Sequence, residues 1–214
     1  TGFDGVRLIG FFSTAPNGLF MRRSITTPLE LDGLKIRALG AIHSDWLNTL
    51  GAAAQTMSGV DMNQALDRDV VDGGIQGWSG MRTFGSFPLI NQAWDVPVGT
   101  TPFLLLINER SWRWQPQSVK RAMLKHGGLS IARSGGKAYA AINQQIRSSL
   151  TEAGQPALMT PSKSAQQALV DRSQELHDIW MTRSIDRETT YRAAQTFLSR
   201  LRAETSTASA GIAP

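Results

Sequence analysis

The stretch LDGLKIRALG, residues 31–40, places a cation inside a short apolar run. The residues on either side of Arg37 have the apolar, β-leaning character of a short buried strand over 34–39, and a glycine stands at each end. A guanidinium stays protonated in proteins, so the Arg37 side chain must reach water, a carboxylate partner or a ligand.

Similar short apolar runs alternate with helical patterns through the first half of the chain. Strands are predicted at 5–12, 34–39, 52–57, 70–76 and 102–109, helices at 44–50 and 61–69 (the second capped by Asp61), and a helical turn at 26–33. This alternation favours an α/β fold with a largely parallel sheet. The run PFLLLINE at 102–109 is typical of a strand that is buried on both faces.

After Arg110 the pattern becomes mainly helical. Helices are predicted from Pro116, over 129–150, from Ser162 or Ser164, and from Asp186 to about Arg202, with one short strand within 152–161. The segment ETSTASAGIAP, residues 204–214, has the small polar composition of a disordered tail.

Composition excludes several classes of protein. Apolar residues make up 41% of the 214, yet no run approaches the roughly 18 residues that a membrane-spanning helix needs. The formal charge of +5 is spread along the chain rather than clustered with aromatic residues, so a nucleic-acid partner is not indicated. The absence of cysteine excludes disulfides, thiolate metal sites and cysteine nucleophiles.

Catalytic motifs are incomplete. GWSGM at 77–81 lacks the second glycine of a nucleophile elbow in the required place, and RSGGKA at 133–138 lacks the first glycine and the final Ser or Thr of a phosphate loop. The three histidines, at 43, 126 and 177, have no metal-ligand spacing and are interpreted as surface or hydrogen-bonded residues. We therefore predict no enzyme activity, although an α/β hydrolase or ligase acting on a carboxylate stays an alternative.

Two explanations of Arg37 follow from spacing alone. The side chain either points into water or pairs with an acid such as Asp32 or Asp72, or it lies where strands end at a cleft and binds a ligand carboxylate with two parallel hydrogen bonds. Ligands of open α/β sheets bind outside the carboxyl ends of the strands, which suits the second explanation.

Four ordered motifs carry a resemblance to a known family. The segments are ITTPLELDGLKIR (25–37), NTLGAAAQTM (48–57), VDMNQALDRDVVDG (60–73) and TTPFLLLINERSWRWQPQSVKRAM (100–123). Together they resemble the solute-binding proteins of tripartite ATP-independent periplasmic (TRAP) transporters, and the similarity runs from about residue 5 to 181. The resemblance implies a two-lobed, periplasmic binding protein-like fold that closes around a small organic acid and delivers it to membrane permease subunits.

The resemblance also assigns site residues. The ligand-binding arginine of the family falls on Arg37 and its polar cleft residue on Gln76, whereas its aromatic position falls on Gly59, which would leave room for a bulky ligand. Ile75 replaces the glutamate with which some members hold a cation, so no metal and no cofactor are expected. Asn17 stands near the position of a second arginine in members that bind sialic acid.

Two further ligand contacts are predicted from this sequence itself. Trp78 could supply apolar surface to the ligand, although a core position is equally compatible with the sequence. Thr100 and Thr101 precede the strand at 102 and could donate hydroxyls, or could simply begin that strand. A ligand sensor that serves no transporter would have the same sequence features.

Domain boundaries follow from the same comparison. We expect a hinge strand and connector at 1–33, a ligand-binding α/β lobe at 34–101, a return strand and helices packing on the first lobe at 102–203, and the tail at 204–214. No signal peptide is visible, and family members carry a substantial segment upstream of this chain's first strand. The first lobe is therefore expected to be incomplete, with 102–109 and the late helices partly unburied.

Overall fold

The computed structural model describes residues 3–96, 98–182 and 185–210 of an α/β protein. The chain divides into two units, residues 1–166 and 167–214, each of which is described by itself. Among the described residues, no helix combines the length and the apolar character that crossing a membrane requires.

The larger sheet contains six strands of the described chain, in the order β4-β3-β5-β2-β6-β8. Their bounds are β2 Gly18–Met21, β3 Lys35–Ala38, β4 Ala53–Thr56, β5 Gly73–Gln76, β6 Gln92–Trp94 and β8 Ala157–Met159. β3 pairs in parallel with β4 and β5, and β6 with β8, whereas β2 runs antiparallel to both β5 and β6. The sheet is thus mixed but mostly parallel, and it draws β2 and β8 from outside the predicted lobe at 34–101.

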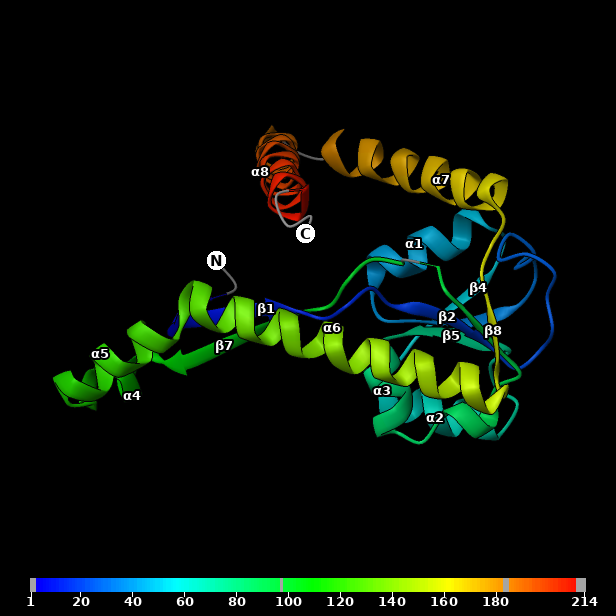
Figure 1. The fold of residues 1–214 in the computed structure, drawn as a ribbon, viewed down its shortest axis with the longest axis horizontal. Coiled ribbons are helices and arrows are strands. Elements are labelled where there is room, and N and C mark those ends of the chain that lie inside the picture. The colour runs from blue at the N-terminus through cyan, green and yellow to red at the C-terminus, as the bar shows by residue number, and fades with distance from the viewer. Residues whose placement is uncertain (1–2, 97, 183–184, 211–214) are drawn as a thin grey trace. The chain divides into compact units, whose positions relative to one another are not determined.

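Helices cover both faces of this sheet. Figure 1 shows α1 on one face and α2 and α3 on the other, where α6 also contacts α3. The bounds are α1 Ala41–Thr49, α2 Gly59–Asp67, α3 Trp78–Thr83 and α6 Gly128–Ala153, with a 3₁₀ turn at Phe87–Leu89. The core on the second face joins Phe20 of β2, Met62 and Leu66 of α2, and Trp78 of α3, and Ile146 and Leu150 of α6 close it.

Local chemistry fixes the helix ends, with two differences from the predictions. Ser58, rather than Asp61, caps α2, because its hydroxyl accepts a hydrogen bond from the Asp61 N–H. The predicted helical turn at 26–33 contains turns but no helix; the Glu30 N–H there donates to the Thr27 carbonyl. The segment between Pro28 and Gly33 contains too few residues for a stable helix.

A second, two-stranded sheet pairs β1 (Val6–Ser13) antiparallel with β7 (Pro102–Asn108). The prediction that β7 is buried on both faces is wrong, because Phe103, Leu104 and Leu105 are each more than 40% exposed. Within the described chain β7 has β1 as its one strand partner, and α6 packs on β1. The exposure agrees with the expectation of an incomplete lobe.

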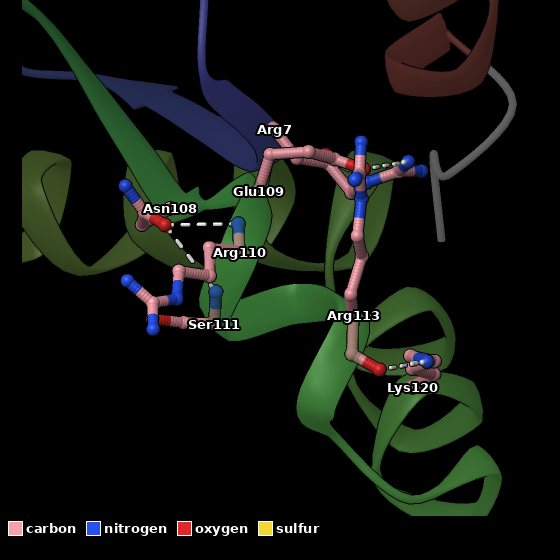
Figure 2. Close-up of polar contacts among 7 residues, drawn as sticks. All are labelled: Arg7, Asn108, Glu109, Arg110, Ser111, Arg113 and Lys120. Carbon is pink, nitrogen blue, oxygen red and sulfur yellow. Dashed lines mark hydrogen bonds and ion pairs between the residues drawn. The ribbon is translucent and has the colours of Figure 1, made fainter.

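Charged contacts join this sheet to the helices that follow it, α4 (Glu109–Trp114) and α5 (Gln117–His126). Figure 2 shows Arg7 of β1 donating two hydrogen bonds of 3.1 Å to Glu109, and Asn108 capping α4 through the backbone N–H groups of Arg110 and Ser111. The Lys120 ammonium donates to the Arg113 carbonyl at 3.1 Å. These groups are solvated, so the ion pair contributes little to stability.

The C-terminal helices are α7 (Lys163–Thr182) and α8 (Ile185–Ala210). Ser162 caps α7 as predicted, since its hydroxyl accepts from the Ala165 N–H. Asp186 lies in the first turn of α8. The backbone of α8 is helical through residues 204–210, part of the segment for which composition predicts disorder, and 211–214 lie outside the described residues.

Candidate functional site

The carboxyl ends of β3, β4 and β5 meet at one edge of the larger sheet, because these three strands are parallel. Arg37 lies on β3, Met57 follows β4, and Gln76 ends β5. Two connecting segments, 14–17 and 98–101, reach the same edge, where Asn17 N–H donates to the Gly99 carbonyl and the next residue, Gly18, pairs with Gln76. The fold therefore gathers the predicted arginine and glutamine where ligands of such sheets bind.

Backbone carbonyls of the two neighbouring strands hold the Arg37 guanidinium. Its Nε and Nη2 donate to the Met57 carbonyl at 3.0 and 2.9 Å, and its Nη1 donates to the Ile75 carbonyl at 2.7 Å. A guanidinium has five N–H groups, so these bonds leave one N–H on each terminal nitrogen without a partner in the described chain. These two remaining donors are as many as a carboxylate accepts from an arginine in a bidentate pair.

No described acid compensates the charge of Arg37. The side chain is only 4% exposed, and it is the one charged residue among the buried residues that the structure describes. The Asp72 carboxylate instead accepts a hydrogen bond from the Lys35 N–H, and its Oδ1 lies 3.8 Å from Nη1 of Arg23. Burial lowers the pKa of Arg37 to about 10, so the group remains cationic at neutral pH. The explanations by solvent and by an ion pair with Asp32 or Asp72 are thus unsupported, and a buried cation of this kind favours binding of an anion.

Gln76 ends the neighbouring strand β5, two residues beyond Gly74, which pairs with Arg37, and it is 7% exposed. Its Oε1 accepts from the Gly77 N–H, whereas its Nε2 has no hydrogen-bond partner among the described residues. A Cβ on Gly59 would lie 2.7 Å from this Nε2 and 2.6 Å from the Phe84 ring. The expectation that Gly59 leaves room for a ligand is therefore wrong, because Gln76 and Phe84 fill that space.

Trp78 and Thr100 are not brought to the arginine. The Trp78 indole is 1% exposed, packs edge-on against Phe20 at 5.0 Å between ring centroids, and lies under the Arg147 guanidinium at 5.4 Å. This is the core position that the sequence had left open. Thr100 is exposed on the connecting segment 98–101, where its neighbour Thr101 makes the polar contacts with Thr14.

Two further polar residues lie at this edge, and the sequence interpretation gave neither of them a ligand-binding role. His43 of α1 lies 3.1 Å from the Val98 carbonyl, and Asn17 is 1% exposed with an Oδ1 that has no partner among the described residues. Burial lowers the pKa of His43, the Val98 carbonyl raises it, and the positive charge of Arg37 lowers it again. A histidine in a helical stretch gives no sequence signal for this placement.

The lowered pKa of His43 predicts a pH dependence of stability. The unfolded chain binds a proton more readily than the folded one, so the free energy of unfolding should fall as the pH drops below the unfolded value of 6.5. In His43→Gln, thermal unfolding between pH 5 and 8 should lose part of this dependence, whereas exposed His126→Gln should keep it. An unchanged pH profile in His43→Gln would contradict the assignment.

A hollow of about 650 Å³ lies along α6. Ala15, Leu158 and polar residues of α6 such as Asn143 and Glu152 line it, and none of the predicted site residues does. Within the described residues, no group of three or more His, Cys, Asp or Glu side chains is arranged to hold a metal ion. Arg37 and its neighbours are thus the candidate site.

Comparison with known proteins decides the family. The model of bacterial extracellular solute-binding proteins, family 7, matches residues 4–183. The chain belongs to this family. The resemblance to TRAP solute-binding proteins that the sequence indicated is confirmed. The members of this family are described as solute-binding proteins, not as enzymes.

Solved structures confirm the fold of this solute-binding protein. A marine metagenome TRAP solute-binding protein specific for aromatic acids, in complex with metahydroxyphenylacetate, has a TM-score of 0.77 at 22% identity over 85% of this chain and 58% of that one. A TRAP periplasmic protein of Desulfovibrio desulfuricans with bound sn-glycerol-3-phosphate has a TM-score of 0.80 at 15% identity over 90% and 62%. Identities this low establish the fold and not the ligand.

This solute-binding protein spans about three fifths of the length of those two structures. A solute-binding protein of Roseobacter denitrificans is 36% identical over 69 residues, which are 32% of this chain and 21% of that protein. This partial coverage is consistent with a lobe that is incomplete within this chain.

Proposed function

We propose that this protein captures a small organic carboxylate outside the cytoplasm, in the periplasm, and delivers it to the membrane permease subunits of a TRAP-type transporter. The observation that carries the proposal is the buried Arg37 guanidinium, which has no acidic partner in the described chain. Membership of the solute-binding family supports the proposed transport role.

In this proposal the carboxylate completes the hydrogen bonding of Arg37. Its two oxygens accept from the remaining N–H groups on Nη1 and Nη2, while Met57 and Ile75 carbonyls hold the guanidinium in place. Burial strengthens this attraction, because few water molecules screen it. Gln76 adds a hydrogen bond from its unpartnered Nε2 amide.

Ligand capture is proposed to close two lobes about a hinge. The connecting segments 14–17 and 98–101 support this idea, since they join the six-stranded sheet to β1 and β7 and are hydrogen-bonded to each other through Thr14 and Thr101. Contacts that the ligand makes only in the closed state would shift the population toward closure.

A thermal-shift screen over organic acids tests the proposal. A carboxylate at about a hundred times its dissociation constant should stabilise the protein by about 2.7 kcal/mol and raise its melting temperature. The neutral amide of the same acid is the control and should give no shift, because it cannot compensate the charge of Arg37. Phosphate monoesters belong in the same screen. A protein that no acid stabilises would contradict the proposed function.

A further inference from the structure

Phe84 lies beside the candidate site, although no sequence motif marks it. It is the residue at which α3 ends, and its ring reaches to within 2.6 Å of the point where a Cβ on Gly59 would lie. The Nε2 of Gln76 approaches the same point to 2.7 Å. The missing side chain of Gly59 thus brings an aromatic ring and a polar amide together at the start of α2.

Gly59 and Gln76 each lie one or two residues after a residue whose carbonyl accepts hydrogen bonds from Arg37. Gly59 follows Ser58 and Met57, and the Met57 carbonyl accepts the hydrogen bonds from Arg37 Nε and Nη2. Gln76 likewise follows Ile75, whose carbonyl accepts from Arg37 Nη1. The residues that carry the amide and that meet the ring are therefore close neighbours in sequence of the two carbonyls that hold the guanidinium.

The backbone that carries Phe84 is held firmly. The Gly85 N–H donates to the Arg82 carbonyl and the Ser86 N–H to the Met81 carbonyl, which is the pattern of a Schellman motif with Gly85 at φ 66°. On the other side, Asn63 of α2 donates to the Phe84 carbonyl at 2.8 Å. The backbone at Phe84 therefore loses little conformational entropy when the residue contacts a ligand.

Exposure and charge restrict what this surface can bind. Phe84 is 38% exposed, so part of the ring is free to contact another molecule. The other buried polar side chains at this edge, Asn17 and Gln76, are neutral, and the lowered pKa of His43 favours its neutral form. A second anionic group on the ligand would therefore lack a cation among the described buried residues.

We infer that Phe84 is a ligand-contacting residue that selects monocarboxylates with an aromatic or similarly bulky apolar body, an inference that rests on the proposed function. The carboxylate binds Arg37, the apolar body packs on the Phe84 ring, and Gln76 donates to a polar group between them. Aromatic contacts of this kind contribute beyond the apolar area that they bury.

Calorimetric titration of phenylacetate, acetate and phenylmalonate tests the inference. The wild-type protein should prefer phenylacetate to acetate, which lacks the ring, and to phenylmalonate, which adds a second carboxylate. Phe84→Ala should bind phenylacetate about tenfold more weakly, with acetate binding, measured by displacement, changed by less than about twofold. Phe84→Leu should fall between the two, and Trp114→Ala, which removes an aromatic residue that is 79% exposed on α4, should bind like the wild type.

The outcomes separate the two proposals. If Phe84→Ala keeps the wild-type preference for phenylacetate while Arg37→Lys weakens carboxylate binding, the inference about Phe84 is overturned and the proposed function stands. Equal weakening for phenylacetate and acetate in a folded Phe84→Ala would also overturn it, because a ligand contact must discriminate between them. If the wild-type protein binds none of the carboxylates, the proposed function itself fails.

Discussion

Replacing Arg37 by lysine is expected to weaken carboxylate binding by roughly 1.5 to 3 kcal/mol. Lysine keeps the charge but has one nitrogen, so it cannot donate in parallel to two carboxylate oxygens while also satisfying the Met57 and Ile75 carbonyls. Calorimetric titration of the wild-type and variant proteins with the strongest acid from the screen measures the difference.

Arg23→Lys is the matched control for this experiment. The Arg23 side chain is 66% exposed and lies 3.8 Å from Asp72, so its replacement should leave the ligand affinity unchanged. Equal affinities of Arg37→Lys and the wild-type protein would remove Arg37 from the binding site. Circular dichroism of both variants establishes that the comparison is made between folded proteins.

Replacing Trp78 by alanine is expected to lower the free energy of unfolding by about 3 to 5 kcal/mol. The indole is 1% exposed, and its removal would leave a cavity between Phe20, Met81 and the helix that carries Arg147. Denaturant unfolding of the variant measures the loss. A change below about 1 kcal/mol would mean that the indole is not the core residue that the structure shows.

Trp78→Phe distinguishes the core position from a ligand contact. Phenylalanine fills most of the cavity, so this variant should remain folded with carboxylate affinity close to that of the wild type. A tenfold loss of affinity in folded Trp78→Phe would return Trp78 to the ligand site. Trp114→Ala provides the surface comparison, with an expected change in stability within about 0.5 kcal/mol.

The sequence predicted the elements whose signals are local. The strand at 34–39 is observed at 35–38, and the helix from Ser162 starts as its cap requires. Arg37 could be selected because a charge inside an apolar strand is unusual, and its burial without an acid partner agrees with that selection. The family motifs assigned Gln76 as a polar cleft residue, and in the structure it ends β5, the strand next to β3.

Features that depend on tertiary contacts could not be predicted. β2 is only four residues long and follows a cluster of turn residues, so its pairing with β5 and β6 left no clear pattern. The apolar run of β7 indicated burial, but burial requires elements on both faces of a strand, and among the described elements α6 packs on this sheet without burying β7. Phe84 and His43 reach the site from α3 and α1, and only the packing of those helices brings them there.

The most direct test of the account is an experimental structure of the protein with a carboxylate ligand from the screen. We predict that the two carboxylate oxygens lie about 2.7 to 2.9 Å from Nη1 and Nη2 of Arg37, with the Met57 and Ile75 carbonyls still hydrogen-bonded to the same guanidinium. A carboxylate bound away from Arg37, with no contact to either terminal nitrogen, would contradict the central claim.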